Sequence, residues 1–295
     1  MTCALAQVPT AVAGSCVVVV PAYRPNLSGD EILSLRHLEH FLPTVDKYLA
    51  MPDTLDFGRD GYREARFAPA FFRGIAGYNR LMLSDDFYAR FASYEYILIH
   101  QLDALILHSD IERFVALDVD YLGAPWVDHD IDGLPRLTHV GNGGLSLRRV
   151  DAFRRLLRSP APKTTAGEYY RERYEKAPRR HRPLGLLKAG LVGLGIQTPI
   201  RAIITTAGAR GACPGLAAEA RDYGPSGAAE DWFISAKANR YYPGFTFGSL
   251  DQALEFAFEK EPRYCFEKAG GRMPFGTHAW RRYDSEFWAP HLLTA

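Results

Sequence analysis

The chain is poor in the features that would place it in several large protein classes. Its four cysteines, Cys3, Cys16, Cys213 and Cys265, are far apart and form no CxxC pair. This spacing argues against a structural zinc site and against a disulfide framework, and it indicates a reducing compartment. No uncharged apolar run reaches about 18 residues, so we predict no transmembrane helix. The net charge of +1 gives no reason to expect nucleic-acid binding.

The composition is that of an ordinary globular protein, with 47% hydrophobic and 23% charged residues. The length of 295 residues suits one large α/β domain or two smaller ones. Residues 1–14 lack the basic start of a signal peptide, so we expect a disordered lead before a single domain over residues 15–295. The aromatic content of 13% fits either a sugar-binding cleft or a well-filled core.

Strand-like and helix-like segments alternate along the chain. Strands are expected at residues 16–20, 46–51 and 65–72 and within 94–107, and helices at 30–41, 74–91 (with a break near Ser84), 111–117 and 150–157. The β-branched run 16–20, closed by Pro21, is typical of a fully buried strand in a parallel sheet. The alternation predicts an α/β fold with an open, mostly parallel central sheet flanked by helices. Ligands of such sheets bind beyond the carboxyl ends of the strands.

Residues 159–228 differ in character from the rest of the chain. A basic, Tyr-rich stretch (169–182) precedes a Gly-, Leu- and Ala-rich stretch (183–209). We expect a helical insertion on the acceptor side of the domain. The alternative is peripheral contact of residues 169–209 with an anionic membrane surface.

The strand-like run YEYILIHQLDALIL (94–107) carries an unusual carboxylate. Its apolar residues are interrupted by Gln101, Leu102 and Asp103. An ionised group buried in a strand is unfavourable by several kcal/mol unless it is paired or bound to a metal, so Asp103 is expected where the strand meets a cleft. Such a carboxylate can hold the divalent metal of a nucleotide-sugar enzyme. The alternative is a structural Asp that caps a turn at the strand end.

Two further motifs offer groups suited to sugar chemistry. The loop that contains Asn142, Gly143 and Gly144 permits close approach of a ligand to the backbone, and the amide can bind sugar hydroxyls; the alternative is a tight turn. Glu230 and Asp231 open a helix-like run, where acids commonly cap the first turn. One of these two carboxylates could instead remove the proton from an acceptor hydroxyl.

Other candidates are less specific. His278 lies in a Gly- and aromatic-rich loop, where metal or pyrophosphate contact is reasonable, although a lone His is more often structural. Arg80 follows Asn79 in an expected helix and could bind a diphosphate, or could be a surface charge. Asp118 and Asp120 form a DxD pattern that competes with Asp103 for the metal.

Taken in order, the motifs form a recognisable series: VVVVPAYRP, YNRLML, YEYILIHQLDALIL, DYLGAPW, GNGGLSLRR, EDWFIS and PFGTHAW. The series resembles a bacterial family of glycosyltransferase-like domains of unknown function. It is similar, more distantly, to fringe-type and other inverting GT-A glycosyltransferases. The resemblance covers most of residues 16–290 and omits 159–228. The GAPW, GNGGLSLR and PFGTHAW motifs are its most specific parts.

The resemblance implies a GT-A-like fold (the nucleotide-diphospho-sugar transferase architecture) and a nucleotide-diphosphate-sugar donor. The expected donor-binding residues, including those proposed from the residues alone, are Pro21, Tyr23, Arg24, Asn79, Arg80, Gln101 and Asp103. The expected acceptor- or sugar-binding residues are Trp126, Asn142, Gly143 and Gly144. Asp103 and His278 are expected to hold Mg²⁺ or Mn²⁺. Asp231, with Glu230 beside it, is expected to act as the catalytic base.

One departure from the family pattern bears on the metal. The triplet is Gln-Leu-Asp rather than Asp-X-Asp, so one carboxylate must hold the ion with diphosphate oxygens and water. Alternatively, Arg24 or Arg80 neutralises the leaving diphosphate.

The function expected from these observations is an inverting transfer of a sugar to a glycan, lipid-linked or other hydroxyl acceptor in cell-surface polysaccharide or glycoconjugate synthesis. The expected location is the cytoplasm or the inner face of the membrane. The alternative is an inactive nucleotide-sugar or glycan-binding module. The donor sugar, its nucleotide and the stereochemical outcome stay open.

Overall fold

The computed structural model describes residues 15–160, 216, 220 and 229–294. The chain divides into two units, Met1–Ser159 with Leu216–Ala295, and Pro160–Gly215. The architecture below is that of the first unit. The expected disordered lead and almost all of the expected helical insertion, including the possible membrane-contacting stretch 169–209, lie outside the described residues.

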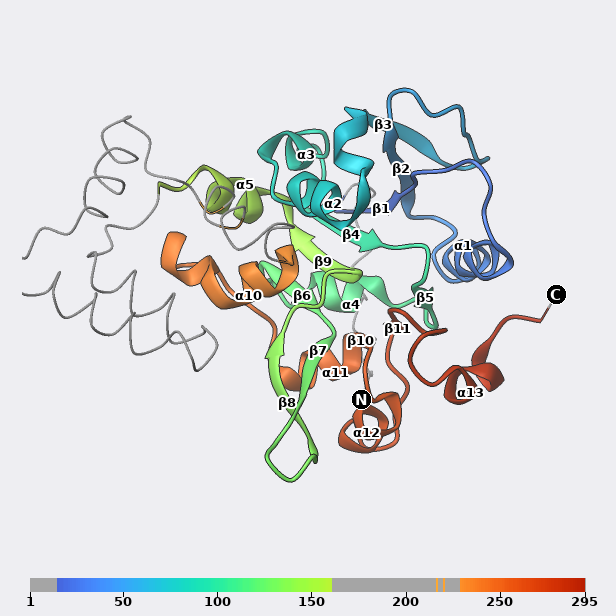
Figure 1. Ribbon diagram of the computed structural model, residues 1–295, viewed down its shortest axis with the longest axis vertical. Helices are drawn as coiled ribbons and strands as arrows, with labels where there is room; N and C mark the ends of the chain where they lie inside the picture. The colour runs from blue at the N-terminus through green and yellow to red at the C-terminus, as the bar shows by residue number, and fades with distance from the viewer. Residues whose placement is uncertain (1–14, 161–215, 217–219, 221–228, 295) are drawn as a thin grey trace, which may run out of the picture. The chain divides into compact units, whose positions relative to one another are not determined.

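A six-stranded sheet forms the centre of this unit (Figure 1). In spatial order its strands are β3 (Arg63–Phe67), β2 (Asp46–Pro52), β1 (Cys16–Pro21), β4 (Tyr96–His100), β9 (Leu145–Arg149) and β6 (Tyr121–Gly123). The first four strands pair in parallel, and β9 runs antiparallel to both β4 and β6. Strand order reverses between β1 and β4, so their carboxyl ends flank the crevice where such sheets bind ligands. The predicted mostly parallel sheet is confirmed.

Two smaller sheets accompany the central sheet. The three-stranded sheet contains β10 (Ala257–Phe258), β11 (Gly276–Thr277) and β5 (Leu105–Ile106), in that order. The third sheet is the hairpin of β7 (Pro125–His129) and β8 (Pro135–Val140).

Helices cover both faces of the central sheet. They are α1 (Gly29–Phe41), η1 (Pro69–Phe72), α2 (Gly74–Met82), α3 (Asp85–Ala89), α4 (Ile111–Val115), α5 (Val150–Arg158), α10 (Glu230–Tyr241), α11 (Leu250–Phe256), α12 (Pro262–Lys268), α13 (Ser285–Trp288) and η3 (Ala289–His291). Side chains of α1, α4 and α11 share one apolar core with β1, β4 and β9. On the other face, α3, α5 and α10 meet around the side chain of Arg148 from β9. The prediction of helices flanking the sheet is confirmed.

Local chemistry explains where several elements begin and end. The Ser28 side chain accepts from the Glu31 N–H and the Glu31 carboxylate accepts from the Ser28 N–H, which is the reciprocal pair that starts α1. The helix expected over 74–91 is two helices, α2 and α3, interrupted at Leu83 and Ser84 as predicted.

Two strand predictions need correction. The strand expected at 65–72 is shifted and shorter, because β3 ends at Phe67 and Pro69 begins the 3₁₀ helix η1. The run 94–107 is two strands in different sheets, β4 and β5, separated by a turn that the Ala104 N–H closes onto the Gln101 carbonyl.

Two of the four cysteines lie in the described part of the chain. Cys16 and Cys265 are buried free thiols, and burial raises the pKa of each to about 12.

Among the described helices, none is both long enough and apolar enough to span a bilayer.

Candidate active site

Strand ends from two sheets meet at one edge of the molecule. Strands β10 and β11 are parallel, so Glu259 and His278, which follow them, emerge on the same side. Strand β5 is antiparallel to β11, so the residues before β5, including Asp103, lie at that same edge. Backbone bonds lock the arrangement: the His278 N–H donates to the Phe258 carbonyl at 3.0 Å. Side chains 175 or so residues apart in sequence are thereby brought together.

The Gln101–Asp103 turn continues directly from β4. The Gln101 N–H donates to the Gly144 carbonyl at 2.9 Å, which joins this turn to the GNGG loop. The Asp103 side chain is 55% exposed, so its carboxylate is available to a ligand. Asp103 therefore lies three residues beyond the end of β4 with an exposed carboxylate, and its place in a cleft stays a prediction.

His278 lies between two carboxylates. Its Nε2 is 3.3 Å from Asp103 Oδ1 and 3.1 Å from Gln101 Oε1, and its Nδ1 is 3.3 Å from Glu259 Oε1. Burial opposes the imidazolium, but the hydrogen bonds and charges of Asp103 and Glu259 outweigh it and raise the pKa of His278 to about 10. The same contact lowers the pKa of Asp103, although burial acts in the opposite direction. In this state His278 carries a positive charge at neutral pH.

The GNGG loop encloses this cluster. Asn142 is 4% exposed; its Nδ2 donates to Glu259 Oε2 at 2.6 Å, and its Oδ1 accepts from the Gly144 N–H at 3.1 Å. A Cβ added at Gly144 would lie 2.0 Å from Nε2 of His278. Only glycine leaves room for the imidazole at this position. Asn142 therefore contacts protein groups that hold the cluster, rather than presenting a free amide.

The GAPW segment packs against the same loop. A Cβ at Gly123 would lie 2.3 Å from the Asn142 carbonyl, and the Gly141 and Asn142 N–H groups both donate to the Ala124 carbonyl. The motif thus supports the GNGG loop. The Trp126 ring is half-buried, and its Nε1 has no hydrogen-bond partner within the described parts of the chain.

Asp231 is bound to the GNGG loop from the opposite side. Its Oδ2 accepts from the Gly143 N–H at 2.9 Å, and its Oδ1 accepts from the Trp232 N–H at 2.7 Å. The side chain is half-buried at the start of α10. Asp231 and Asp103 therefore both border the loop formed by residues 141–144.

Glu230 occupies a different environment from its neighbour. Its side chain is 3% exposed, and Oε1 accepts from Nη2 of Arg148 at 2.8 Å. Burial raises the pKa of the Glu230 carboxyl, and Arg148 offsets part of that effect. In this arrangement the Glu230 carboxylate is not exposed to a substrate. Of the two acids expected at the catalytic position, only Asp231 is left as a candidate.

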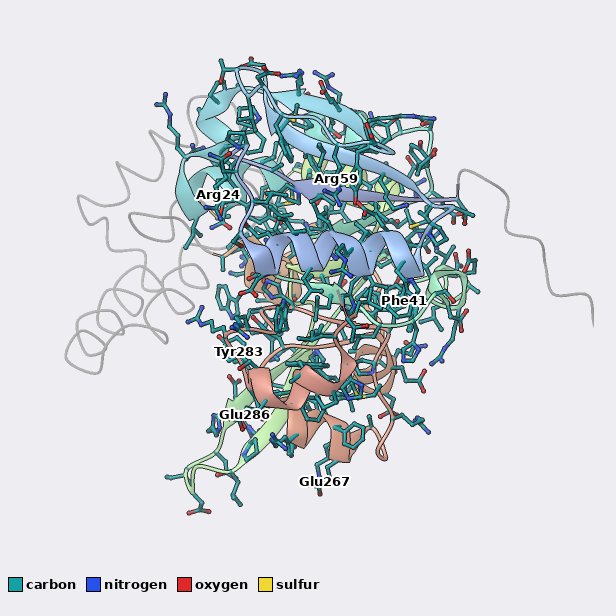
Figure 2. The ribbon with its side chains drawn as sticks, turned by 90° about the vertical axis from the view of Figure 1, so that its right-hand side faces the viewer. Arg24, Phe41, Arg59, Glu267, Tyr283 and Glu286 are labelled. Atoms are coloured by element: carbon teal, nitrogen blue, oxygen red, sulfur yellow. The ribbon has the colours of Figure 1, made fainter. Side chains whose placement is uncertain are left out.

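The residues after β1 lie at the carboxyl edge of the sheet, as predicted. Tyr23 is 55% exposed, and the Arg24 guanidinium lies 5.6 Å from the centre of its ring. Both Glu31 oxygens accept from Arg24 Nη2 at 2.8 Å. Figure 2 shows Arg24 beside the start of α1 and Phe41 at its other end. Pro21 is the last residue of β1 and is buried.

The two candidates from α2 are placed differently. Asn79 is 8% exposed, within the helix. Arg80 is exposed, but its Nη2 donates to the Ala70 carbonyl at 2.9 Å, which ties α2 to η1. This contact accounts for Arg80 structurally.

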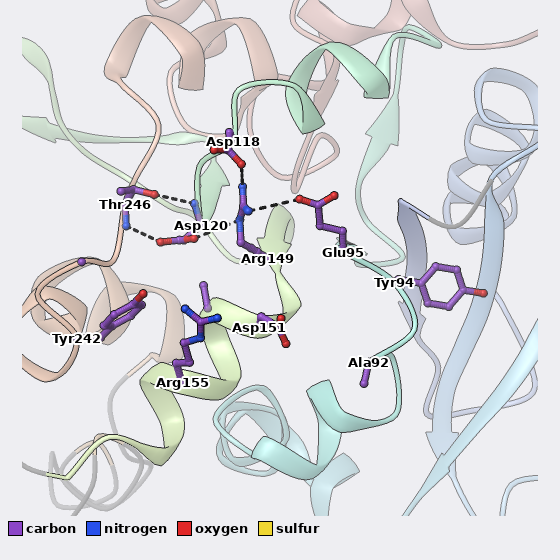
Figure 3. Close-up of a pocket in the computed structure, with 12 residues that line it drawn as sticks. Ala92, Tyr94, Glu95, Asp118, Asp120, Arg149, Asp151, Arg155, Tyr242 and Thr246 are labelled. Atoms are coloured by element: carbon purple, nitrogen blue, oxygen red, sulfur yellow. Dashed lines mark hydrogen bonds and ion pairs between the residues drawn. The ribbon is translucent and has the colours of Figure 1, made fainter. Parts of the chain in front are cut away.

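Asp118 and Asp120 lie away from this site. They precede β6, and their partner Arg149 pairs with Tyr96 at the amino end of β4, opposite the end that carries Asp103. Asp120 also accepts from the Thr246 N–H at 2.8 Å. The pocket there has a volume of about 420 Å³ (Figure 3). The DxD pattern therefore binds an arginine and a backbone amide, and it does not compete with Asp103 at the carboxyl edge.

Sequence reasoning missed two residues that organise the site, Glu259 and Arg148. Glu259 follows the short apolar run FAF (256–258), so the argument used for Asp103 could have identified it. Arg148 gave no comparable signal, because an arginine in LSLRR reads as a strand-end surface charge until its burial is known.

Two side chains at this edge carry groups that a divalent cation can use, although no group of three or more such ligands is found among the described residues. Asp103 offers an exposed carboxylate and His278 an imidazole nitrogen beside it, while Glu259 contacts the other ring nitrogen. A carboxylate behind a ligating histidine is the usual way in which proteins orient such a ligand. The remaining positions around Mg²⁺ or Mn²⁺ would be filled by substrate oxygens and water.

The chain matches a family described as "Protein of unknown function (DUF5672)" over residues 61–278. No curated protein matches it. Three solved structures are similar to the chain at low identity. A glycosyltransferase involved in glycosylation of the major capsid of PBCV-1 has 10% identity and a TM-score of 0.43, over 94% of this chain and 98% of that one. The galactosyltransferase LgtC, in complex with donor and acceptor sugar analogs, has 13% identity and a TM-score of 0.42, over 94% and 96%. The glycosyltransferase GlyE of Streptococcus pneumoniae TIGR4 has 11% identity and a TM-score of 0.43, over 95% and 61%.

Proposed function

The chain belongs to the DUF5672 family, and we propose that it is a glycosyltransferase that uses a nucleotide-diphosphate-sugar donor. The observation that carries the proposal is the cluster of Asp103, His278 and Glu259 beside the GNGG loop. The cluster lies at the carboxyl edge of a sheet whose strand order reverses between β1 and β4, where α/β sheets bind nucleotides. Asp231 on the other side of the loop supplies a second carboxylate.

The donor is proposed to lie across the ends of β1 and β4. Tyr23 offers an exposed ring for stacking on a nucleobase. Arg24, already paired with Glu31, fixes the position of that ring and retains donors toward solvent. The diphosphate would then reach the Gln101–Asp103 turn.

Asp103 and His278 are proposed to hold Mg²⁺ or Mn²⁺, with Glu259 orienting the imidazole. When bound, the ion would neutralise the charge that develops on the leaving diphosphate. Binding requires the neutral imidazole, so it releases a proton from His278. Gln101 contributes an amide oxygen next to His278 where the family pattern would place a carboxylate.

Asp231 is proposed to remove the proton from the acceptor hydroxyl. Two backbone N–H groups orient its carboxylate, and the side chain is only half-buried. Attack by the deprotonated hydroxyl on the anomeric carbon, opposite the departing diphosphate, would invert that centre. Trp126 and the GNGG loop are proposed to contact the sugars.

The acceptor class and cellular role follow from the same proposal. A glycan or lipid-linked acceptor, in synthesis of a cell-surface polysaccharide or glycoconjugate at the cytoplasmic side of the membrane, suits an enzyme of this kind. Nucleic acid is not proposed as a partner, because the net charge is only +1.

A catalytically inactive sugar-nucleotide-binding module is the second candidate. The observation that favours it is Gln101, which leaves Asp103 as the one carboxylate of the triplet. A binding module would bind the nucleotide and transfer nothing.

The two candidates are separated by binding and turnover on one sample. Calorimetric titration with UDP, GDP and dTDP in the presence of Mn²⁺ identifies the nucleotide, and release of nucleoside diphosphate from a panel of donor sugars measures turnover. We expect turnover that Asp103→Asn abolishes and the exposed control Asp86→Asn retains. Nucleotide binding without turnover on any donor would make the module reading correct.

A further inference from the structure

The most deeply buried charges beside the candidate site belong to Arg148 and Glu230. The Arg148 side chain is 0% exposed and that of Glu230 is 3% exposed. Arg148 comes from β9 and Glu230 from the first position of α10, so this ion pair joins the central sheet to the helix that carries Asp231.

Arg148 uses all of its nitrogen atoms. Nε donates to Ser146 Oγ at 2.9 Å, Nη1 donates to the Tyr88 hydroxyl at 3.0 Å, and Nη2 donates to Glu230 Oε1 at 2.8 Å. Nη2 also lies 3.4 Å from the Gly143 carbonyl. One guanidinium therefore contacts both the GNGG loop and the first residue of α10.

Aromatic rings close the remaining sides of the guanidinium. Its central carbon lies 5.3 Å from the centre of the Tyr121 ring and 5.4 Å from that of Phe153. A rigid planar fork held in this way has little freedom to move. The groups that it contacts are held with it.

The start of α10 lacks the usual means of fixing a helix. Ala229 precedes it and has no side chain that could accept a hydrogen bond from the first turn. Two side-chain contacts take that role: Glu230 to Arg148, and Asp231 to the Gly143 N–H. Gly143 is thus held through its carbonyl by the Ser146 hydroxyl at 3.1 Å and by Arg148, and through its N–H by Asp231.

We propose that Arg148, through its ion pair with Glu230, is a positioning residue that sets Asp231 and the Gly143 peptide in register for the transfer reaction. This inference rests on the proposed function, because it assigns Arg148 no contact with substrate. A buried ion pair adds little net stability compared with well-packed apolar side chains, so fold stability alone does not require it. The contact of Arg148 Nη2 with the Gly143 carbonyl is what an apolar pair could not provide.

The test separates position from stability by replacing the whole pair. In Arg148→Met, a buried Glu230 is left without its cation, and the urea midpoint should fall. In Arg148→Met/Glu230→Leu, no uncompensated charge remains, and the midpoint should return toward that of the wild type. The control is Arg59→Met, which removes a bidentate pair with Glu39 near the Phe41 end of α1, away from Arg24.

Three readouts are compared. They are the urea midpoint, the kcat and donor KM measured with the donor that the turnover assay identifies, and amide hydrogen exchange at residues 141–144 and 230–234. In the double variant we expect kcat to fall about 100-fold, the loss typical of a misplaced group. Donor KM should stay within about 3-fold of the wild-type value, since Tyr23 and Asp103 are untouched. Exchange should accelerate at Gly143 and stay slow in β1 and β4. Arg59→Met should leave kcat and exchange at Gly143 unchanged.

A double variant with restored midpoint, wild-type kcat and slow exchange at Gly143 would overturn the proposal. Should the double variant not fold, Arg148→Lys decides, because it keeps the charge but cannot reach Glu230, Tyr88 and Gly143 together. Unchanged kcat and exchange in Arg148→Lys would then refute the assignment. If the wild type turns over no donor, the proposed function fails, and the exchange at Gly143 still decides whether Arg148 positions the loop.

Discussion

A single methyl group at Gly144 tests the geometry of the candidate site most directly. In Gly144→Ala the added Cβ would lie 2.0 Å from Nε2, 2.2 Å from Cδ2 and 2.3 Å from Cε1 of His278. The backbone of Gly144 is held by its bonds to Gln101 and Asn142, and β9 begins at the next residue. The imidazole must therefore move, by about 1.5 Å, to reach an ordinary contact near 3.5 Å.

The magnitude follows from what that movement breaks. Overpacking of this kind lowers the free energy of unfolding by about 2 kcal/mol. Glu259, 11% exposed, would lose its charged partner, which adds roughly 1–2 kcal/mol. We expect a total destabilisation of about 3–4 kcal/mol. A ring displaced by more than 1 Å from Asp103 should also lower kcat by about 100-fold.

Urea unfolding and donor turnover measure the two effects. Gly29→Ala is the matched control, because no atom lies within 4 Å of its added Cβ and α1 begins there. The double variant Gly144→Ala/His278→Ala removes the ring atoms that the methyl group meets. Its free energy of unfolding should lie closer to that of His278→Ala than the sum of the single changes predicts, while turnover stays low.

Two results would refute this reasoning. One is a Gly144→Ala protein with wild-type stability and turnover, since His278 would then not occupy the space beside Gly144. The other is strict additivity of the two substitutions, since the methyl group and the ring would then not be in contact.

Three further predictions follow from the site. Asp103→Asn should abolish turnover at every Mn²⁺ concentration and lower the free energy of unfolding by no more than about 1 kcal/mol, because the carboxylate that pairs with His278 is 55% exposed; a fully active variant would exclude Asp103 from metal binding. Asp231→Asn should lose turnover and keep calorimetric nucleotide affinity, and lost affinity would make Asp231 a donor ligand. In metal-free protein, the raised pKa of His278, from 6.5 to about 10, contributes stability that is complete below pH 6.5 and is lost as pH rises toward 10. Urea midpoints between pH 6 and 10 should therefore decline less in His278→Gln than in the wild type, and parallel declines would contradict the assigned charge.

The central strands of the sheet were predictable from local sequence patterns. The run 16–20 is apolar, and four of its five residues are β-branched valines, which is typical of a strand buried on both faces; it is the central β1. The Ser28 cap and the break at Ser84 were equally readable, because capping and helix interruption depend on near neighbours in sequence. The split of 94–107 into β4 and β5 was not, because the second strand pairs with β11, which is about 170 residues further along the chain.

The candidate site was predicted only in part. Asp103 and His278 were identified one by one, as residues out of place in apolar or glycine-rich surroundings. Nothing local separated Glu230, fully paired inside the protein, from Asp231, which borders the site. Asp118 and Asp120 match the DxD metal-binding pattern, whereas the QLD triplet does not. In the structure they lie at the opposite end of the sheet from Asp103.

The sequence by itself determined the central strands β1 and β2, several of the helices and an unexplained carboxylate in the QLD triplet, because these depend on spacing and on the burial that spacing implies. Only the tertiary structure decided what that carboxylate meets. Two parallel strand ends and one antiparallel strand bring Glu259, His278 and Asp103 to one edge, and a glycine at 144 leaves room for the imidazole. Such contacts depend on strand order and direction, which are set by packing across the whole domain and leave no local signature.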